Sequence, residues 1–586
     1  MLGKIVEIID NSVLINLSID INNQANLVNL HVVFDDNEKK IVGVITNLNQ
    51  STMKVNIVGE LSNNLFIPGS SSKPSFKSIV RIIKIDELEL ILGSQNSVSG
   101  QTYFGTSNVY KNYKINVSIN DFFSNHFAIL GNSGSGKSCS VASVIQNLFL
   151  SQKPPIKSNI FFFDAFGEYT KAFSELHQKN TLINYKTYTT NTKFPDTEVI
   201  HIPAWLLDVD DLALLLEVST PNQLPIIEKT LRLVPILSGN SNDVIKRKND
   251  IIARALQDIL LSGNGSVKVR DQVTAVLTKF NTPELNLEST ISQPGYVRTL
   301  KQCLYIDKTG KMQEMELVVE FIRTYINDDL QEVNVENLNN CYSLEDLEMA
   351  MDFALISEGI LNSEKVFDYA NVLRVRLHSL INSDYVEYFR YDHFTTKEQF
   401  VNDLVIDKMT GGKCQIVNFN INYIDDRLAK VITKIISKML FSLASVSNSR
   451  GSTAFHIIIE EAHRYVQKDK DIDIIGYNIF ERITKEGRKY GVFLGLITQR
   501  PSELSDTSIS QCSNFIILRT LHPKDLDYIK NMVPNISSEI VQQLKNLKPG
   551  NCIAFGNAFK VPISMYIPLP NPRPLSNNVD LNNVWY

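Results

Sequence analysis

Residues 126–150 read HFAILGNSGSGKSCSVASVIQNLFL. The apolar run at 126–130 predicts a buried strand, and residues 138–150 have the apolar spacing of a helix. Between them, residues 131–138 fit the pattern G-x-x-x-x-G-K-[ST], in the strand–turn–helix context that this pattern requires. The stretch therefore predicts a phosphate-binding loop in an α/β fold. A chance glycine- and serine-rich turn would lack both flanking elements.

The residues of this loop predict a nucleotide site. The backbone N–H groups of such a loop wrap phosphates, and the positive end of the following helix faces them. Lys137 is expected to reach the β- and γ-phosphates of ATP, and Ser138 is expected to ligate Mg²⁺. The predicted nucleotide-binding residues are Gly131, Asn132, Ser133, Gly134, Ser135, Gly136, Lys137, Ser138 and Cys139.

A second apolar run, AFHIIIEEAHRYV at residues 454–466, ends in two adjacent acids. Neighbouring negative charges repel each other unless a cation faces them, and Mg²⁺ bound to ATP supplies one. We expect Glu460 to face the metal and Glu461 to orient and deprotonate the attacking water. Without the phosphate loop, these acids would be interpreted as charges at the start of the next helix; with the loop, the catalytic interpretation is favoured.

Three further segments carry candidate site residues. FFFDAFGEY at 161–169 ends a strand at Asp164, which is expected either to reach the same metal or water or to cap the next helix. LGLITQRPSEL at 494–504 places Gln499 just past a strand, where its amide can sense the γ-phosphate or can be a turn residue. ERITKEGRKYG at 481–491 offers Arg482 and Arg488, either as charge for a neighbour's nucleotide or as part of a solvated helix face.

Strands and helices alternate on both sides of these motifs, which predicts a mainly parallel sheet covered on both faces. Residues 1–95 contain six short β-branched runs and predict a small β-barrel. Residues 205–400 have helical spacing, which predicts a helical insertion. The sheet domain is therefore expected at 96–204 and 401–560. Residues 561–586 are proline-rich, so we expect an extended arm that lies on a neighbour and is neither a helix nor a central strand.

Composition limits the class of protein. A chain of 586 residues suggests two to four domains, and a net charge of −5 means that any nucleic-acid contact is a local basic groove or a ring interior. The nearest two of the six cysteines, Cys303 and Cys341, are 38 residues apart, which argues against zinc and disulfide sites and fits a reducing cytoplasm. No secretory signal or membrane-spanning run is present, so a cytoplasmic protein without membrane contact is expected.

Taken in order, the barrel-like start GKIVEII, the loop GNSGSGKS, DAFGEY, IIIEEAHRY and KEGRKYGVFLGLITQRPSEL resemble HerA, a bacterial and archaeal ring ATPase related to the FtsK DNA pumps. The resemblance covers nearly the whole chain. It implies a RecA-like core, a homo-hexamer with ATP sites between subunits, and duplex DNA in a central channel. It also implies metal and base roles for Glu460 and Glu461, phosphate sensing by Gln499, and a finger in trans from Arg488, with Arg482 as the alternative.

The chain departs from the family at one position. Family members often place an arginine just before the strand that precedes the phosphate loop, where this chain has Asn125 and His126. The resemblance also implies a partner: either an effector, a sirtuin-like NADase or a nuclease, in anti-phage defence, or the NurA nuclease in DNA-end resection. The composition, which suits an AT-rich mobile locus, favours the defence partner.

Three classes of function were compared. The first is an ATP-driven motor on duplex DNA with an effector, for which residues 467–471 (QKDKD) and 410–413 (TGGK) are candidate pore loops. The second is an assembly scaffold whose ATPase activates or restrains its effector with little translocation. The third, a metabolic kinase, is disfavoured because no acceptor pocket is evident and a basic segment follows the two glutamates.

Overall fold

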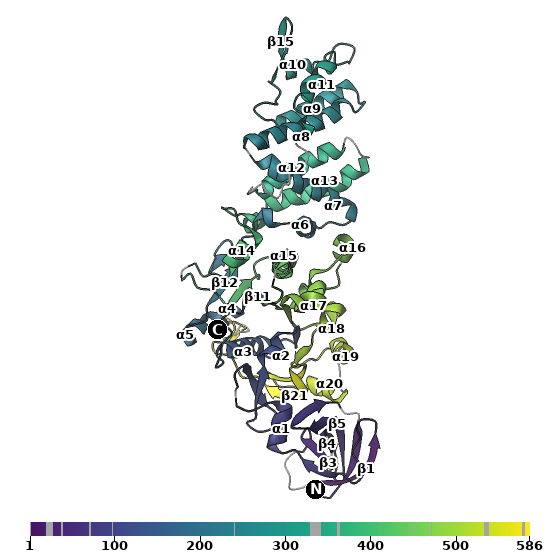
Figure 1. Cartoon of the computed structure of the whole chain (residues 1–586), viewed down its shortest axis with the longest axis vertical. Coiled ribbons are helices and arrows are strands. Elements are labelled where there is room, and N and C mark those ends of the chain that lie inside the picture. Colours follow the sequence, from purple (N-terminus) through teal and green to yellow (C-terminus); the bar gives the residue numbers. More distant parts are fainter. Residues whose placement is uncertain are drawn as a thin grey trace. The chain divides into compact units, whose positions relative to one another are not determined.

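The computed structural model describes all of the chain except residues 1, 19–26, 37–38, 70–71, 97, 240, 329–340, 360–363, 409, 448, 470, 533–537, 577–580 and 586. The chain forms two compact units, whose elements are labelled in Figure 1. The first unit comprises Met1–Glu198, Phe400–Asp469 and Asn478–Tyr586. The second comprises Val199–Gln399 and Lys470–Tyr477.

The first unit begins with an antiparallel sheet in the order β1-β2-β5-β4-β3-β7, with β6 paired to β5. Its strands are β1 (Gly3–Ile9), β2 (Ser12–Leu17), β3 (His31–Asp36), β4 (Lys39–Leu48), β5 (Thr52–Ser62), β6 (Leu65–Pro68) and β7 (Ile79–Ile82). The six expected strands are present, and β6 is an additional one. The ends of the path meet where Leu2 N–H donates to the Val80 carbonyl at 2.8 Å. A closed barrel stays a prediction.

The larger sheet runs in the order β12-β16-β11-β17-β18-β10-β19-β20-β21-β8-β9. Its strands are β8 (Gln101–Ser107), β9 (Lys114–Ser118), β10 (Phe127–Leu130), β11 (Ile160–Asp164), β12 (Tyr185–Thr189), β16 (Ile416–Asn420), β17 (Phe455–Ile459), β18 (Val492–Thr498), β19 (Asn514–Ile517), β20 (Asn551–Gly556) and β21 (Phe559–Tyr566). The strands from β12 to β19 pair in parallel. The strands from β20 to β9 extend the sheet in antiparallel pairing. The protein is therefore a mixed α/β protein.

Helices cover both faces of the parallel part. They are α3 (Lys137–Phe149), α4 (Tyr169–Ser174), α15 (Asp426–Val446), α17 (Ile479–Tyr490) and α18 (Asp506–Ser510). From β10 the chain passes through α3 and α4 towards β12, whereas from β16 it passes through α15 and α17 in the opposite direction along the sheet. Because such crossovers are right-handed, the two sets of helices lie on opposite faces. The carboxyl ends of β10, β11, β17 and β18 therefore meet at one edge, where ligands bind in open α/β sheets.

The C-terminal segment differs from the expected arm. Residues 559–566 form the strand β21, which lies between β20 and β8. Val561 and Ile563 are buried, while Pro562 between them is exposed. Pro562 lies before the two residues that pair with β8, so the pairing with β8 does not need the N–H that proline lacks. Farther on, Leu575 N–H donates to the Glu168 carbonyl of the same chain at 2.8 Å. As far as Leu575 the segment thus packs on its own chain, and a short helix with exposed apolar side chains, α21 (Leu581–Trp585), follows.

The second unit is mainly helical. Its elements are α6 (Val209–Leu215), α7 (Leu224–Ser238), α8 (Asn242–Leu260), α9 (Ser266–Lys279), α10 (Leu300–Cys303), α11 (Met315–Arg323), α12 (Leu344–Gly359), α13 (Glu364–Ile381), α16 (Asp471–Ile475) and the hairpin of β14 (Thr290–Gln293) and β15 (Tyr296–Thr299). α7 and α12 pack against each other. Among the described residues of both units, no helix combines the length and apolar character needed to cross a membrane.

Candidate nucleotide-binding site

The phosphate loop connects β10 to α3 and adopts a conformation that its glycines permit. Gly134 and Gly136 have φ angles of 72° and 91°, which side chains other than glycine rarely adopt. A Cβ on Gly136 would also lie 2.8 Å from the backbone nitrogen of Gly550. Gly131 N–H donates to the Thr498 carbonyl at 3.1 Å, so the end of β18 fixes the start of the loop.

Lys137 and Glu461 form a buried ion pair, with Nζ 2.7 Å from Oε1. Their side chains are only 7% and 5% exposed. Lys137 is the first residue of α3, and Glu461 follows β17 with a φ of 45°. A left-handed residue other than glycine costs about 1–3 kcal/mol, so the surrounding packing has to hold Glu461 in place. The structure thus joins the predicted phosphate lysine to the predicted base.

His463 contacts the same glutamate, although no role was assigned to it from sequence. Its Nδ1 lies 3.2 Å from Glu461 Oε2 and 3.0 Å from Thr498 Oγ1. Burial raises the pKa of Glu461, but the hydrogen bond from His463 and the charge of Lys137 outweigh burial, so this pKa is lowered from its ordinary value. Glu461 is therefore ionised at neutral pH. The only sequence signal for His463 was its position three residues after the first acid.

Glu460 and Asp164 form a second buried pair of acids. Glu460 N–H donates to the Phe163 carbonyl at 3.0 Å, which places the ends of β17 and β11 side by side. Burial raises the pKa of both carboxyl groups, and the negative charge of Asp164 raises that of Glu460 further. Glu460 Oε2 is buried and has no hydrogen-bond partner in the described part of the chain. Burial and the neighbouring charge thus disfavour two negative charges in this pair.

Asp164 also fills the alternative role that the sequence left open. Its two oxygens accept the backbone N–H groups of Glu168 at 3.1 Å and Tyr169 at 2.8 Å. These bonds fix the turn before α4, so Asp164 has a capping function. Among the described residues, no group of three or more His, Cys, Asp or Glu side chains is arranged to hold a metal ion unaided.

Gln499 lies beside the phosphate loop, where its Oε1 accepts a hydrogen bond from Ser133 Oγ at 2.8 Å. Gln499 directly follows β18, whose last residue, Thr498, pairs with Leu130 at the end of β10. The side chain thus joins the strand after the two glutamates to the loop itself. This contact places Gln499 where the sequence predicted it.

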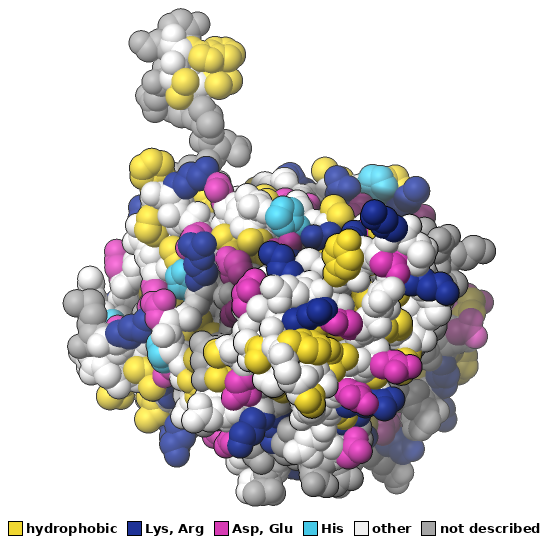
Figure 2. Space-filling model, turned by 90° about the horizontal axis from the view of Figure 1, so that it is seen from above, with side chains coloured by type: hydrophobic (Ala, Val, Ile, Leu, Met, Phe, Trp, Pro, Cys, Tyr) yellow, Lys and Arg dark blue, Asp and Glu magenta, His cyan; other side chains and the backbone are white. Residues whose placement is uncertain are grey.

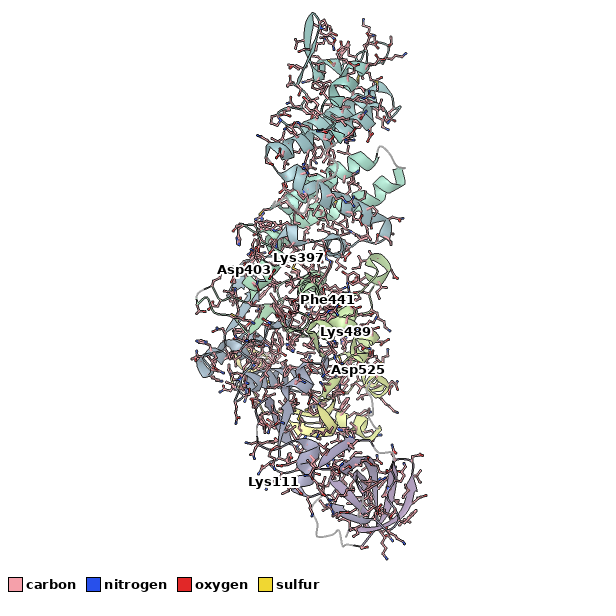
Figure 3. All side chains as sticks on the ribbon, viewed as in Figure 1. Lys111, Lys397, Asp403, Phe441, Lys489 and Asp525 are labelled. Atoms are coloured by element: carbon pink, nitrogen blue, oxygen red, sulfur yellow. The ribbon has the colours of Figure 1, made fainter. Side chains whose placement is uncertain are left out.

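Arg482 and Arg488 are not brought to their own phosphate loop. Both are exposed on α17. Arg482 Nε lies 3.6 Å from Glu486 Oε2, and its guanidinium lies over the ring of Phe441 in α15. Figure 3 labels Phe441 and also Lys489 of α17. For Arg488, no ion pair or hydrogen bond occurs within the described residues, but its charge acts on buried His126 and lowers the pKa of that imidazole. Arg488 therefore lies near the amino end of β10, at the edge opposite the phosphates.

Arg519 is a further polar residue of the site, and sequence analysis did not single it out. It lies two residues past β19, and its carbonyl accepts the N–H of Asn132 at 3.0 Å. The reasoning that selected Gln499, a polar residue just past an apolar strand, would have selected Arg519 as well.

Comparisons with known proteins show what this chain is similar to. The family model described as "Helicase HerA, central domain" matches residues 103–440. The DNA double-strand break repair helicase HerA of Pyrococcus furiosus is 23% identical over 514 residues, which are 87% of this chain and 76% of the relative. HerA of Saccharolobus solfataricus is 30% identical over 203 residues, 33% of this chain and 40% of the relative. The solved structure of VirB4 of Thermoanaerobacter pseudethanolicus is 13% identical with a TM-score of 0.42 over 81% of this chain and 98% of that one.

The family model spans more than half of the chain, including the phosphate loop and Asp164. The chain belongs to the HerA helicase family and is an ATP-hydrolysing enzyme.

Proposed function

We propose that this protein is a ring-forming motor, a homo-hexamer, that hydrolyses ATP to move on duplex DNA. The observation that carries the proposal is the buried contact between Lys137 and Glu461, because it links a phosphate-binding lysine to an ionised carboxylate that is held ready beside it. The relatives named above are described as DNA double-strand break repair helicases, which supports DNA as the substrate.

Nucleotide binding has to break the ion pair between Lys137 and Glu461. The β- and γ-phosphates attract Lys137, and its departure leaves Glu461 free to accept a proton from the attacking water. His463 keeps its contact with Glu461 Oε2 during this change and so holds the carboxylate in position. Gln499, already bonded to Ser133, is placed to respond to the γ-phosphate. Glu461 is thus the general base in this mechanism, with Lys137 and Gln499 on the phosphates.

The residues present fit a Mg²⁺ ion. Glu460 has a buried oxygen without a partner among the described residues, and burial together with the negative charge of Asp164 raises its pKa, although the charge of Lys137 acts in the opposite direction. Ser138, Glu460 and Asp164 would hold the ion, directly or through water, although both oxygens of Asp164 already accept backbone N–H groups. When bound, the ion neutralises charge on the phosphates.

The position of Arg488 supports an ATP site between subunits. α17 ends at Tyr490, two residues before β18 begins at Val492. β18 spans 7 residues, and at a rise of about 3.3 Å per residue it separates Arg488 from its own phosphate loop by about 20 Å. An arginine at this edge can reach a nucleotide only on a neighbouring copy. Arg482 is already engaged with Glu486 and Phe441, which makes it the weaker candidate.

The contact with DNA is local in this proposal. On the face shown in Figure 2, the described Lys and Arg side chains are interspersed with Asp and Glu. In the first candidate pore loop, Lys468 pairs with Asp506, and Asp469 pairs with Lys430 and Lys434, while Lys470 lies outside the described residues. In the second, Lys413 donates to the Lys157 carbonyl at 3.2 Å. The described charges of the first loop are thus paired within one chain, and the Lys413 ammonium is bonded to a backbone carbonyl, so neither loop gains support.

The partner is the second part of the proposal. Composition favours an effector subunit, a sirtuin-like NADase or a nuclease, in anti-phage defence; a NurA-type nuclease in end resection is the alternative motor partner, and a regulatory scaffold with little translocation is the alternative function. Native mass determination with and without neighbouring gene products measures ring size and partner together. A ring that binds its effector but shows no ATP-driven movement on DNA would favour the scaffold.

ATP turnover with duplex DNA tests the enzymatic core of the proposal. Lys137→Ala should reduce turnover by about 100-fold or more, because a principal charge on the transferred phosphate is lost. Lys153→Ala, an exposed lysine that follows the same helix, is the matched control and should turn over normally. Normal ATP hydrolysis by Lys137→Ala would reject the proposed site.

A further inference from the structure

The end of β19 is bonded to the phosphate loop by its backbone. Leu518 N–H donates to the Leu130 carbonyl at 2.8 Å, and Asn132 N–H donates to the Arg519 carbonyl at 3.0 Å. Leu521 N–H donates to Asn132 Oδ1 at 3.1 Å. These three bonds fix residues 518–521 against the start of the loop, so the Arg519 side chain leaves the backbone right beside it.

The Arg519 guanidinium faces the apex of the loop and lacks a partner. A Cβ built on Gly134 would have Arg519 Nη2 as its nearest neighbour, at 4.0 Å. The Nε of Arg519 is buried without a hydrogen-bond partner, and within the described part of the chain its side chain makes no ion pair. A buried donor left unpaired costs about 1–3 kcal/mol, and more when it is charged. The Arg519 side chain is half-buried, and its buried Nε needs a partner that the described part of the chain does not supply.

The position of Arg519 identifies the chemistry of that group. β18 and β19 flank β10, with Thr498 and Ile517 both paired to Leu130. Gln499, one residue past β18, bonds Ser133 on one side of the loop. Arg519, two residues past β19, faces Gly134 on the other side. A group that reaches both the loop N–H groups and this guanidinium is an anion, and the anion that a phosphate loop holds is the phosphate of a nucleotide, which arginine binds with charge-assisted hydrogen bonds.

We propose that Arg519 binds the polyphosphate of the nucleotide held by its own chain. This role rests on the proposed ATP site but differs from that of Arg488, because the backbone bonds to Asn132 tie Arg519 to the loop in cis. The guanidinium adds positive charge on the phosphate side opposite Gln499. It favours nucleotides with a β-phosphate and makes no contact with the base.

Nucleotide-binding measurements with ATP, ADP and AMP test this role. Arg519→Gln should weaken ATP and ADP binding by about 10-fold or more, which corresponds to one charge-assisted hydrogen bond, and should leave AMP binding unchanged. Arg519→Lys should retain part of the affinity. Lys524→Gln removes a nearby exposed charge and should bind all three nucleotides like the unmodified protein.

Thermal melting without nucleotide separates binding from folding. Arg519→Gln removes a half-buried cation whose Nε is unpaired in the described part of the chain, so the variant should melt at the same temperature or higher. Unchanged ATP binding by Arg519→Gln would overturn the inference, as would an equal loss for AMP, ADP and ATP, which indicates a distorted loop. Failure of the proposed function is distinguishable, because it would appear as normal ATP turnover in Lys137→Ala, whatever Arg519→Gln does.

Discussion

The two edges of the parallel sheet differ in whether charged side chains are buried there. At the carboxyl edge, Lys137 and Glu461 are buried together, and Glu460 lies beside Asp164. At the amino edge, His126 is buried and His456 is half-buried, and each imidazole has its pKa lowered to about 4, largely by burial.

Arg488, at the amino edge, is exposed instead of buried. An edge with buried charge suits a charged ligand, whereas an exposed arginine such as Arg488 suits contact with another molecule. This difference fits the proposed function, in which the carboxyl edge binds the nucleotide and the amino edge faces a neighbouring copy.

The largest expected effect is at the carboxyl edge, in Glu461→Gln. The amide cannot accept a proton from water, so ATP should bind while hydrolysis falls by about 100-fold or more. Nucleotide binding and single-turnover hydrolysis, measured on the same preparation, separate the two steps. Glu503→Gln, which alters a half-exposed acid paired with Arg500, is the control. If Glu461→Gln hydrolyses ATP normally, the base role moves to another acid, with Asp164 the next candidate.

A smaller loss of ATP turnover is expected for Arg488→Ala, at the amino edge. Action in trans can be recognised in this variant by mixing it with a second one. This variant keeps its own loop and base but lacks the finger, whereas Glu461→Gln keeps the finger but lacks the base. Mixed rings of the two inactive proteins should recover ATP turnover, because some interfaces combine an intact loop with an intact Arg488.

Arg482→Ala is the matched control for this experiment and should lose less activity, since Arg482 is paired within its own helix. Absence of recovery in mixed rings, together with full recovery for Arg482→Ala mixtures, would transfer the finger role to Arg482.

The smallest effect concerns the acid stability of the amino edge. His126 and His456 stay neutral in the folded chain but are protonated in the unfolded chain below about pH 6.5. The stability that these neutral histidines contribute is therefore complete above that pH. As the pH falls towards 4, the free energy of unfolding decreases by about 1–3 kcal/mol for each histidine. Denaturant unfolding at pH 7 and pH 5 measures the loss.

Two variants sharpen this measurement. Replacing both histidines by glutamine should reduce the difference between the two pH values. Arg488→Ala should reduce it slightly, because the charge of Arg488 helps to lower the pKa of His126. An unchanged difference in the double variant would show that other groups control acid stability.

The local pattern of the sequence predicted the elements that carry the site. A glycine-rich turn between an apolar strand and a helix has few alternatives, so the loop and Lys137 were predictable. The strand that ends in Glu460 and Glu461 and the strand before Gln499 were predictable for the same reason. β21 was mispredicted, because a proline-rich sequence does not reveal that Pro562 lies outside the part of the strand that pairs with β8.

The sequence by itself determined the residue types at each motif: a glycine-rich loop with a lysine, acids that follow apolar strands, and alternating elements that form an α/β core. Only the tertiary structure decided how these groups are paired. It joined Lys137 to Glu461, placed His463 behind that carboxylate, brought unpartnered Arg519 to Gly134, and set Arg488 at the opposite edge. The physical reason is that residue type and spacing follow from local rules, whereas partners and burial depend on strand order, which brings residues hundreds of positions apart to the same edge.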